Sequence, residues 1–516
     1  MANAAKLIAN LYRDSVSLMQ LSASLAARPG IEQASAIMAT PANLALLAEA
    51  GLDRGKRAPR PNDLLIAVRG RNPADLEAAL AAASAELERP ATAAAAGGPA
   101  SMPLRSLQMA LEQASAERPA PNLALISTPG EYAAAEAMKA LRLGLNAMLF
   151  SDNVALRDEI ELKRYAKGRG LLVMGPDCGT AIIQGIPLGF ANAVRRGAIG
   201  VVGASGTGTQ QVTCLVHRLG AGISHAIGTG GHDLSARVGG ITMLQGIKAL
   251  AGDAQTKVLV LVSKPPAPAV ARLVLAAARR CGKPVVVNFV GAPTGSVRGA
   301  NLHQAETLED AARLAVKLLA GRSREKIQFK LNFKGIPRLS ARQHYVRGLF
   351  SGGTFCYEAS ALLGAALGEV WSNAPVDPRL RLANVHKSRG HSLVDLGDDE
   401  FTRGRPHPMI DFRLRNERIL AEARDPEVAV ILLDVVLGYG AHPDPAAELA
   451  PVLGKARALA RKAGRKLALV GFVCGTGEDP QGLARQERAL RAAGMVLAGS
   501  NAQAARLAAA IAGRRR

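Results

Sequence analysis

The sequence predicts an α/β protein made of several doubly wound domains, Rossmann-like and flavodoxin-like, with a small α+β module at the N-terminus. The main observation is that, beyond residue 103, short apolar strand-like runs alternate with helical patterns. Such alternation is typical of parallel sheets that are covered by helices on both faces. The 516 residues are enough for about three or four domains. Hydrophobic residues make up 48% and charged residues 21%, which is ordinary for a globular protein.

The N-terminal module is expected to span residues 1–87, because helical patterns and strand-like runs alternate within it. The helical patterns lie at 15–27 and 41–51, and the strand-like runs lie at 31–39 and 63–70. Residues 88–103 combine proline, glycine and repeated alanine without apolar periodicity, which predicts a linker.

Three further units follow, each with the length and rhythm of a doubly wound sheet. They span residues 104–192, 193–320 and 344–516, and the polar, basic segment 321–343 connects the last two. In the first unit, strand-like runs lie at 122–127, 146–151 and 171–175. In the second unit, they begin at residues 198, 223, 258 and 284. In the third unit, they lie at 345–350, 428–436, 466–474 and 494–500.

Composition excludes several function classes. The net charge is +22, but the basic residues are scattered and aromatic residues make up only 3%, so we expect no nucleic-acid partner. A positive field would still attract a small anionic substrate. The sequence has no apolar run of about 18 residues and no convincing secretory signal, so we expect a cytoplasmic protein with no membrane contact. Its five cysteines are dispersed and form no CxxC pair, which predicts neither disulfides nor a metal site.

The stretch GASGTGTQQ, residues 203–211, follows an apolar run and leads into a helical pattern. A second turn of the same design, SGGT, follows the strand-like run at 345–350. The first N–H groups of a helix and its dipole favour an anion, so two such turns facing one another would surround one phosphoryl or carboxylate group. Capping of the helices by the hydroxyls is the alternative. The candidate anion-binding residues are Gly203, Ser205, Gly206, Thr207, Ser351, Gly352, Gly353 and Thr354.

Longer motifs carry a resemblance to a known family. MGPDCGTAI at 174–182, followed by residues 197–235, resembles the α chain of succinyl-CoA synthetase. LFSGGTFCYEA, HSLVDLGDDEF and VAVILLDVVLGYGAHPDPA resemble the carboxyl-terminal domain of that enzyme's β chain. With LYRDSVSLMQ and SAIMATPANLALL near the start, nearly the whole chain is similar to the FdrA family of fused acyl-CoA-synthetase-like proteins.

The resemblance implies an acyl-CoA ligase-like activity with coenzyme A as cofactor. Residues 104–192 would be a CoA-binding-like Rossmann domain, while 193–320 and 344–516 would be ligase domains 1 and 2. The loop at 127–137, with Gly130, would lie near the CoA phosphates, although an ordinary helix entry is an equal alternative. The loop lining the acyl site would comprise Gly175, Pro176, Asp177, Cys178 and Gly179. We expect Cys178 to be a small buried thiol and not a nucleophile.

The sequence departs from the family at two places. Synthetases of this family carry a phosphoryl group on a histidine, but Ala300 stands at the comparable position and His303 lies three residues further on, so the catalytic residue is unknown. The ATP-grasp half of the β chain has no counterpart, and the sequence contains no GxxxxGK[ST] motif. What remains is a phosphate-stabilised acyl site with fixed donors, for which further polar candidates are His225, His232, Asp233, Asp395, Asp434 and His442.

Three functions stay open. The first is an acyl-CoA synthetase-like component that works with partner subunits in an oligomer. The second is a subunit of an oxamate carbamoyltransferase of purine degradation, in which phosphate attacks a carbamoylated substrate without ATP or a phosphohistidine. The third is a non-catalytic scaffold or ligand sensor, whose N-terminal module contacts partners.

Overall fold

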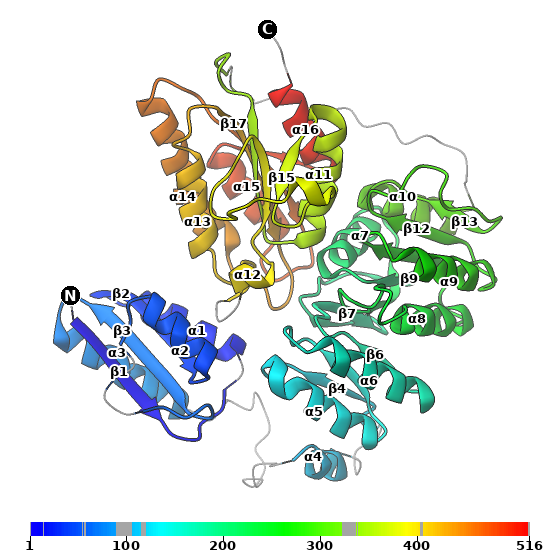
Figure 1. Ribbon diagram of the computed structural model, residues 1–516, viewed down its shortest axis with the longest axis horizontal. Coiled ribbons are helices and arrows are strands. Elements are labelled where there is room, and N and C mark those ends of the chain that lie inside the picture. The colour runs from blue at the N-terminus through cyan, green and yellow to red at the C-terminus, as the bar shows by residue number, and fades with distance from the viewer. Residues whose placement is uncertain are drawn as a thin grey trace. The chain divides into compact units, whose positions relative to one another are not determined.

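The computed structural model describes residues 2–513 except 14, 54, 56–57, 89–105, 115–119, 322–336, 338 and 403–405. The chain separates into two compact units, one of Met1–Pro121 with Thr402–Pro406 and one of Asn122–Phe401 with His407–Arg516 (Figure 1). Most of the two expected linkers, 88–103 and 321–343, lies outside the described residues.

The first unit is a three-stranded antiparallel sheet with helices on both faces. Alternate residues of the central strand decide which helices cover which face, since successive side chains of a strand point to opposite sides. Leu64, Ile66 and Val68 pack with α1 and α3, whereas Leu65 and Ala67 pack with α2. In sheet order the strands are β1 (Ala2–Ile8), β3 (Leu64–Gly70) and β2 (Ile31–Met38), and the helices are α1 (Ser15–Ala26), α2 (Pro41–Glu49), α3 (Pro73–Glu88) and α4 (Leu107–Ala114).

The expected elements of this module are present, but sequence patterning missed β1 and α3. The strand β1 reads ANAAKLI and has a single β-branched residue, so its intrinsic strand propensity is low. It becomes a strand because it pairs with β3 along its whole length, from Ala2 opposite Gly70 to Ile8 opposite Leu64.

The second unit begins with a small parallel sheet and two helices. The strands, in order, are β4 (Leu123–Ile126), β5 (Asn146–Leu149) and β6 (Val173–Met174), and the helices are α5 (Gly130–Arg142) and α6 (Leu156–Gly168). Alanine and leucine side chains of both helices share a core with β4 and β5.

A seven-stranded sheet follows, and the first glycine-rich turn joins one of its strands to a helix. In order, its strands are β13 (Leu302–Gln304), β12 (Val285–Phe289), β11 (Val258–Ser263), β9 (Arg196–Gly203), β10 (Ile223–Gly228), β7 (Thr180–Ile183) and β8 (Ile186–Gly189). Its helices are α7 (Gly206–Arg218), α8 (Ile241–Gly252), α9 (Pro268–Arg279) and α10 (Leu308–Leu319). The strands from β13 to β10 are parallel, whereas β7 and β8 are antiparallel additions to the edge. Residues 180–189 therefore belong to this sheet, although the sequence analysis groups them with the preceding unit.

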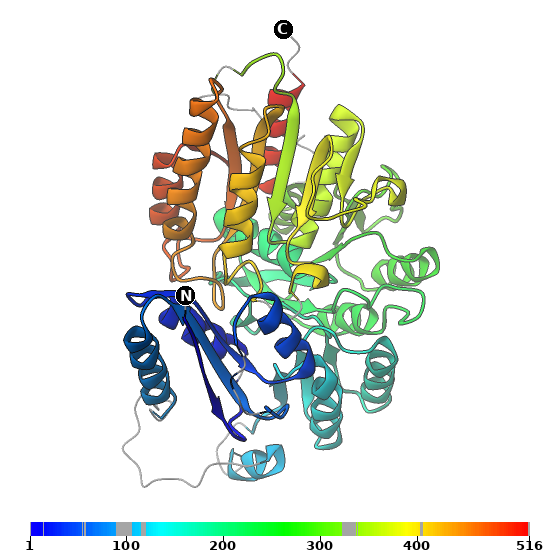
Figure 2. The same ribbon diagram turned by 60° about the vertical axis from the view of Figure 1, so that its left-hand side comes forward.

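A six-stranded parallel sheet completes the unit (Figure 2). Its strands, in order, are β15 (Val370–Ser372), β16 (His391–Asp395), β14 (Tyr345–Phe350), β17 (Val428–Val436), β18 (Ala468–Cys474) and β19 (Met495–Ala498). Its helices are α11 (Gly353–Leu367), the short 3-10 helix η1 (Pro378–Leu380), α12 (Asp399–Thr402), α13 (Arg413–Glu422), α14 (Pro445–Lys462), α15 (Leu483–Ala492) and α16 (Asn501–Ala512). Every residue of β17 and β18 is buried, as expected for central strands covered on both faces. The predicted fold class is confirmed.

Candidate functional site

The glycine-rich turn after β9 opens into a small pocket at the N-terminus of α7. Three segments form its walls: the turn itself, the loop that enters β7, and the loop that follows β10. The cavity measures about 40 Å³, which is room for a small head group. Its lining residues are Asp177, Cys178, Gly179, Thr180, Gly203, Ala204, Ser205, Gly206, Gly228, Gly230 and Gly231.

Glycines allow the walls to approach one another closely. A Cβ atom at Gly228 would lie 2.5 Å from the carbonyl oxygen of Thr180, and one at Gly230 would collide with the carbonyl oxygen of Pro176. Gly230 also has a φ of +86°, a conformation that side chains rarely adopt. At Gly206, by contrast, a Cβ atom would meet only ordinary contacts, the nearest at 3.5 Å. The pocket is therefore rigid on the side of the loops and open in front of α7.

The N-terminus of α7 supplies hydrogen-bond donors to this opening. Ser205 is the N-cap, and its Oγ accepts the N–H of Gly208 at 2.9 Å. The N–H groups of Gly206 and Thr207 have no intrahelical acceptor, and neither donates to another residue that the structure describes. These donors, with the positive end of the helix dipole, favour a phosphoryl or carboxylate group.

The structure brings the two glycine-rich turns into direct contact. Ser205 Oγ lies 2.5 Å from Thr354 Oγ1, within one hydrogen bond. Thr207 packs against the second turn, because a Cβ atom at Gly352 would lie 2.8 Å from its Cγ2. The N-termini of α7 and α11 are therefore neighbours.

The second turn is engaged by the protein's own carboxylates. The N–H of Ser351 donates to both oxygens of Asp434, at 2.9 and 3.1 Å, and the N–H of Gly352 donates to Asp434 Oδ2 at 2.9 Å. Arg415 donates to the other oxygen of this buried carboxylate at 2.9 Å. Gly353 abuts the carboxylate of Asp395, since a Cβ atom there would collide with it. Fewer amides are thus open to a ligand than the sequence suggests, because Asp434 already binds the N–H groups of Ser351 and Gly352.

Burial controls the protonation of these two carboxyls. Desolvation raises the pKa of Asp395 to about 6, with the charge of Lys264 opposing the shift. It also raises the pKa of Asp434, although Arg415 and the amide donors oppose the rise.

The loop at residues 175–179 is fastened to the end of β5. The N–H of Asp177 donates to the carbonyl of Ser151 at 2.9 Å, and that of Cys178 donates to the carbonyl of Leu149 at 3.0 Å. Burial raises the pKa of the Cys178 thiol to about 12, so the thiolate is not populated near neutral pH. Asp177, Cys178 and Gly179 line the pocket, whereas Gly175 and Pro176 lie buried behind it.

A buried cluster of charged residues fixes the loop that follows β10, which forms the third wall of the pocket. Lys163 Nζ is fully buried and donates to Glu159 Oε1 at 2.7 Å, to Asp233 Oδ1 at 2.8 Å and to the carbonyl of Thr229 at 2.9 Å. Asp233 in turn accepts the N–H groups of Thr242 and Met243 at the start of α8. The loop that carries Gly230 and Gly231 is therefore anchored to both α6 and α8.

His232 joins this cluster at the rim of the pocket. Its Nδ1 lies 3.6 Å from Glu159 Oε2, and its side chain is 69% exposed. The bond to Glu159 raises the pKa of His232 although partial burial opposes the shift, and the charges of Asp177 and Asp399 add to the rise. Glu159 is itself desolvated, but its bonds to His232 and Lys163 lower its pKa. The sequence analysis named His232 and Asp233 but missed Glu159 and Lys163, whose four-residue spacing on one helix was the available signal.

Other candidates lie away from the pocket. His303 is on the edge strand β13, opposite Val286 of β12, and two further strands separate β12 from the turn after β10. Ala300 is in the exposed turn before β13. His225 accepts the N–H of Gln184 at 3.2 Å, and His442 accepts that of Asp444 at 3.1 Å. None of these four residues lines the pocket.

Gly130 is required by packing within the protein. A Cβ atom at Gly130 would collide with the carbonyl oxygen of Asp152 and lie 2.6 Å from that of Asn153. The close backbone approach that this glycine permits is therefore to the loop after β5, and any contact with CoA stays a prediction.

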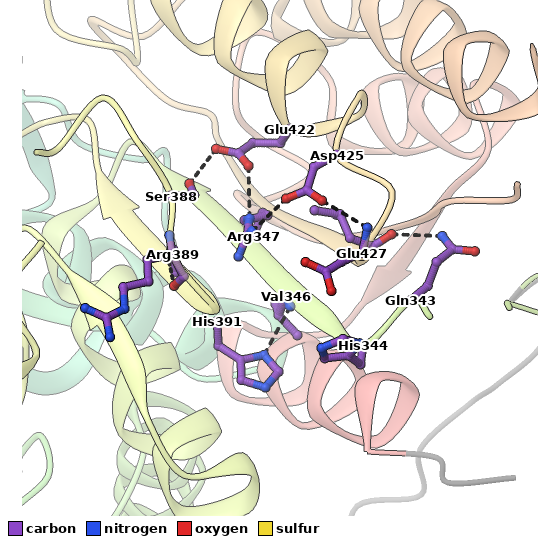
Figure 3. A network of polar contacts seen from close by, with 12 residues as sticks. Gln343, His344, Val346, Arg347, Ser388, Arg389, His391, Glu422, Asp425 and Glu427 are labelled. Carbon is purple, nitrogen blue, oxygen red and sulfur yellow. Dashed lines mark hydrogen bonds and ion pairs between the residues drawn. The ribbon is translucent and has the colours of Figure 1, made fainter. Parts of the chain in front are cut away.

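A second polar network lies at the other end of β14 and stabilises the sheet (Figure 3). Arg347 donates to Glu422 at 3.0 Å and to Asp425 at 2.9 Å, and Arg418 donates to the same Glu422 at 2.7 Å. Burial and the charge of Arg347 lower the pKa of the neighbouring His391 to about 4. Because these charges are paired with one another, the network ties β14 to α13.

Comparisons with protein-family models place known domains on three parts of the chain. A CoA-ligase model matches residues 349–511, a CoA binding domain model matches 194–291, and a model described as AllF, heavy metal-associated domain, matches 1–103. The CoA binding match contains the turn at 203–209. Residues 1–103 contain neither cysteine nor histidine, so this segment has no thiolate or imidazole ligand for a heavy metal.

Sequence relatives cover the chain to different extents. The uncharacterized protein YahF of Escherichia coli is 45% identical over 97% of this chain and 96% of its own length. A succinate–CoA ligase [ADP-forming] subunit alpha of Staphylococcus epidermidis is 28% identical over 34% of this chain and 57% of its own length. These descriptions support a CoA-ligase relationship and give no support to carbamoyl transfer or purine degradation.

Solved structures align with this chain at low identity and with low TM-scores. A dinucleotide-forming acetyl-coenzyme A synthetase 1 of Ca. Korarchaeum cryptofilum aligns with 77% of this chain and 83% of its own, at 16% identity and a TM-score of 0.32. PH0766 of Pyrococcus horikoshii aligns at 13% identity and a TM-score of 0.33.

Among the described residues, no helix has the length and hydrophobicity to cross a bilayer, and no group of three or more metal-ligating side chains forms a metal site.

Proposed function

This chain belongs to the succinyl-CoA synthetase-like FdrA family, and from this premise we propose that it is an acyl-CoA ligase-like enzyme. The pocket at the start of α7 would hold the phosphate of an acyl phosphate, or the carboxylate from which it is made. The observation that carries the proposal is that Gly206 lines a cavity of about 40 Å³, and that its N–H and the N–H of Thr207 next to it have no acceptor among the described residues.

The chemistry follows from fixed donors. In acyl transfer to a thiol, the C–S bond forms, the bond from the carbonyl carbon to the phosphate oxygen breaks, and phosphate leaves with the thiol proton. Negative charge accumulates on the departing phosphate, and preoriented N–H groups stabilise such charge without reorganisation. Ser205 fixes the first turn of α7 through its cap to Gly208 and its bond to Thr354. This route starts from an acyl phosphate that is already formed, so it needs no phosphohistidine.

Coenzyme A, when bound, supplies the acceptor thiol, and the CoA binding domain match over residues 194–291 supports its use. The small cavity fits a phosphoryl or carboxylate group and not a whole nucleotide, so the rest of the CoA molecule would lie outside it. The ATP-grasp half of the succinyl-CoA synthetase β chain has no counterpart in this sequence, and we propose that a partner subunit makes the acyl phosphate.

The test bypasses ATP by offering acetyl phosphate and CoA to the purified chain. We expect thioester formation that depends on the protein and is inhibited by inorganic phosphate, together with stabilisation of the fold by phosphate. Absence of thioester, with no stabilisation by phosphate or CoA, would contradict the proposal. Phosphate-dependent cleavage of carbamoyl-oxamate without CoA would assign the same pocket to carbamoyl transfer instead.

A further inference from the structure

His232 stands apart from the other histidines in position and partners. It follows Gly230 and Gly231, which line the pocket, and Asp177 from the facing wall interacts with it electrostatically. Its Nδ1 is held 3.6 Å from Glu159 Oε2. Its Nε2 makes no hydrogen bond to any residue that the structure describes.

The carboxylate behind His232 is itself held in place. Glu159 is 1% exposed and lies on α6, where Lys163 neutralises it from 2.7 Å. Lys163 is also bound by Asp233, which follows His232 in the chain. His232 thus follows the pocket-lining Gly231 directly, lies at ion-pair distance from a fixed carboxylate and has an unbonded Nε2 among the described residues. A histidine paired with a carboxylate next to a substrate pocket is an arrangement used for proton transfer in catalysis.

We propose that His232 is the general base and acid of the acyl-transfer reaction, oriented by Glu159. This inference rests on the proposed function and assigns a catalytic residue to the same site. The neutral imidazole takes the proton of the attacking thiol at Nε2, and the sulfur forms its bond to the carbonyl carbon. The phosphate leaves, and the imidazolium returns the proton to a phosphate oxygen.

The charged neighbours of His232 decide how the proton moves. Glu159 comes from α6, Asp177 from the loop before β7 and Asp399 from α12, and all three favour the imidazolium. Lys163 offsets part of this negative charge. The imidazolium formed in the first half of the reaction is therefore stabilised beside a departing anion. In the resting enzyme, His232 becomes protonated and can no longer act as a base as the pH falls through its pKa.

The first experiment measures the histidine directly, by NMR of the protein labelled at histidine Cε1, with H232N to assign the resonance. We expect saturating inorganic phosphate to shift the His232 resonance, and E159Q to lower the His232 pKa. If phosphate binds but leaves this resonance unmoved, the inference on His232 is overturned while the proposed function stands. If phosphate does not bind at all, both fail.

The second experiment follows thioester formation from acetyl phosphate and CoA. H232N is expected to lower kcat by about 100- to 10,000-fold with little change in KM, and E159Q is expected to move the acidic limb of the kcat profile to lower pH. His303→Asn is the matched control, since this histidine lies on the distant edge strand, and it should retain wild-type rates. Wild-type kcat in H232N, or loss of activity in H303N alone, would overturn the assignment.

Discussion

Replacing Gly206 by alanine is expected to block anion binding while leaving the fold intact. A Cβ atom at this position would lie 3.5 Å from Thr180 Oγ1 and 3.7 Å from Gly179 Cα, which is ordinary contact. Gly206 is the first residue of α7, and its φ is not in the left-handed region, so alanine can adopt the same conformation. The substitution therefore adds a methyl group inside the pocket without a steric penalty to the protein.

The expected loss follows from the size of the cavity. The added methyl group lies between Gly206 and the facing wall of the pocket, because its nearest neighbours are Thr180 and Gly179, which both line the cavity. An anion displaced by it loses at least one hydrogen bond to a charged group, worth about 1.5–3 kcal/mol. The affinity for inorganic phosphate should then fall roughly 10- to 100-fold, as measured by isothermal titration calorimetry.

Gly364→Ala provides the matched control. Gly364 lies inside α11, and no heavy atom stands within 4 Å of the position its Cβ would take. This variant makes the same chemical change, from glycine to alanine in a helix, without touching the pocket. Equal phosphate affinity in G206A, G364A and the wild type would refute the placement of the anion at the start of α7.

Three further outcomes are expected. Lys163→Met should destabilise the second unit by about 3–5 kcal/mol, because two buried carboxylates lose their cation, and a thermal midpoint unchanged from the wild type would contradict the buried cluster. In the native protein iodoacetamide should modify Cys281 alone among the five cysteines, since the other four are buried; mass spectrometry showing native alkylation of Cys178 would refute its burial. Burial raises the pKa of Glu358 from 4.5 to about 7, so the folded state binds this proton more tightly than the unfolded state does. The stability that proton binding contributes is therefore lost as the pH rises from about 4.5 through 7. The thermal midpoint of Glu358→Gln minus that of the wild type should therefore increase as the pH rises from 5 to 8. A difference that does not change with pH would contradict the raised pKa of Glu358.

Local patterning predicted the strands and the turn that position the site. The runs at 198, 223, 258 and 284 became β9 to β12, because short, largely apolar segments bounded by turn or breaker residues indicate buried parallel strands. The turn at 203–206 was identifiable for the same reason, since a strand, a small-residue turn and a helix follow within a few positions. These signals are local, and neighbouring residues decide them.

The partners of the two turns could not be predicted from local patterning. Asp434 lies 83 residues from Ser351 and reaches it only because β17 pairs with β14. Lys163 meets Asp233 across 70 residues, from a helix of one sheet to a loop of another. Sequence spacing carries no record of such pairings without the topology, so the second turn looked as open as the first.

The difference between the two turns explains why one pocket would take one anion. The N-termini of α7 and α11 meet at Ser205 and Thr354, so their positive ends add at one place. Asp434 and Asp395 already face α11, and a phosphate there would oppose their negative charge. The N–H of Gly206 at the start of α7 lies in the wall of the cavity, and no acceptor among the described residues takes it. The two aspartates beside α11 thus confine a ligand anion to α7.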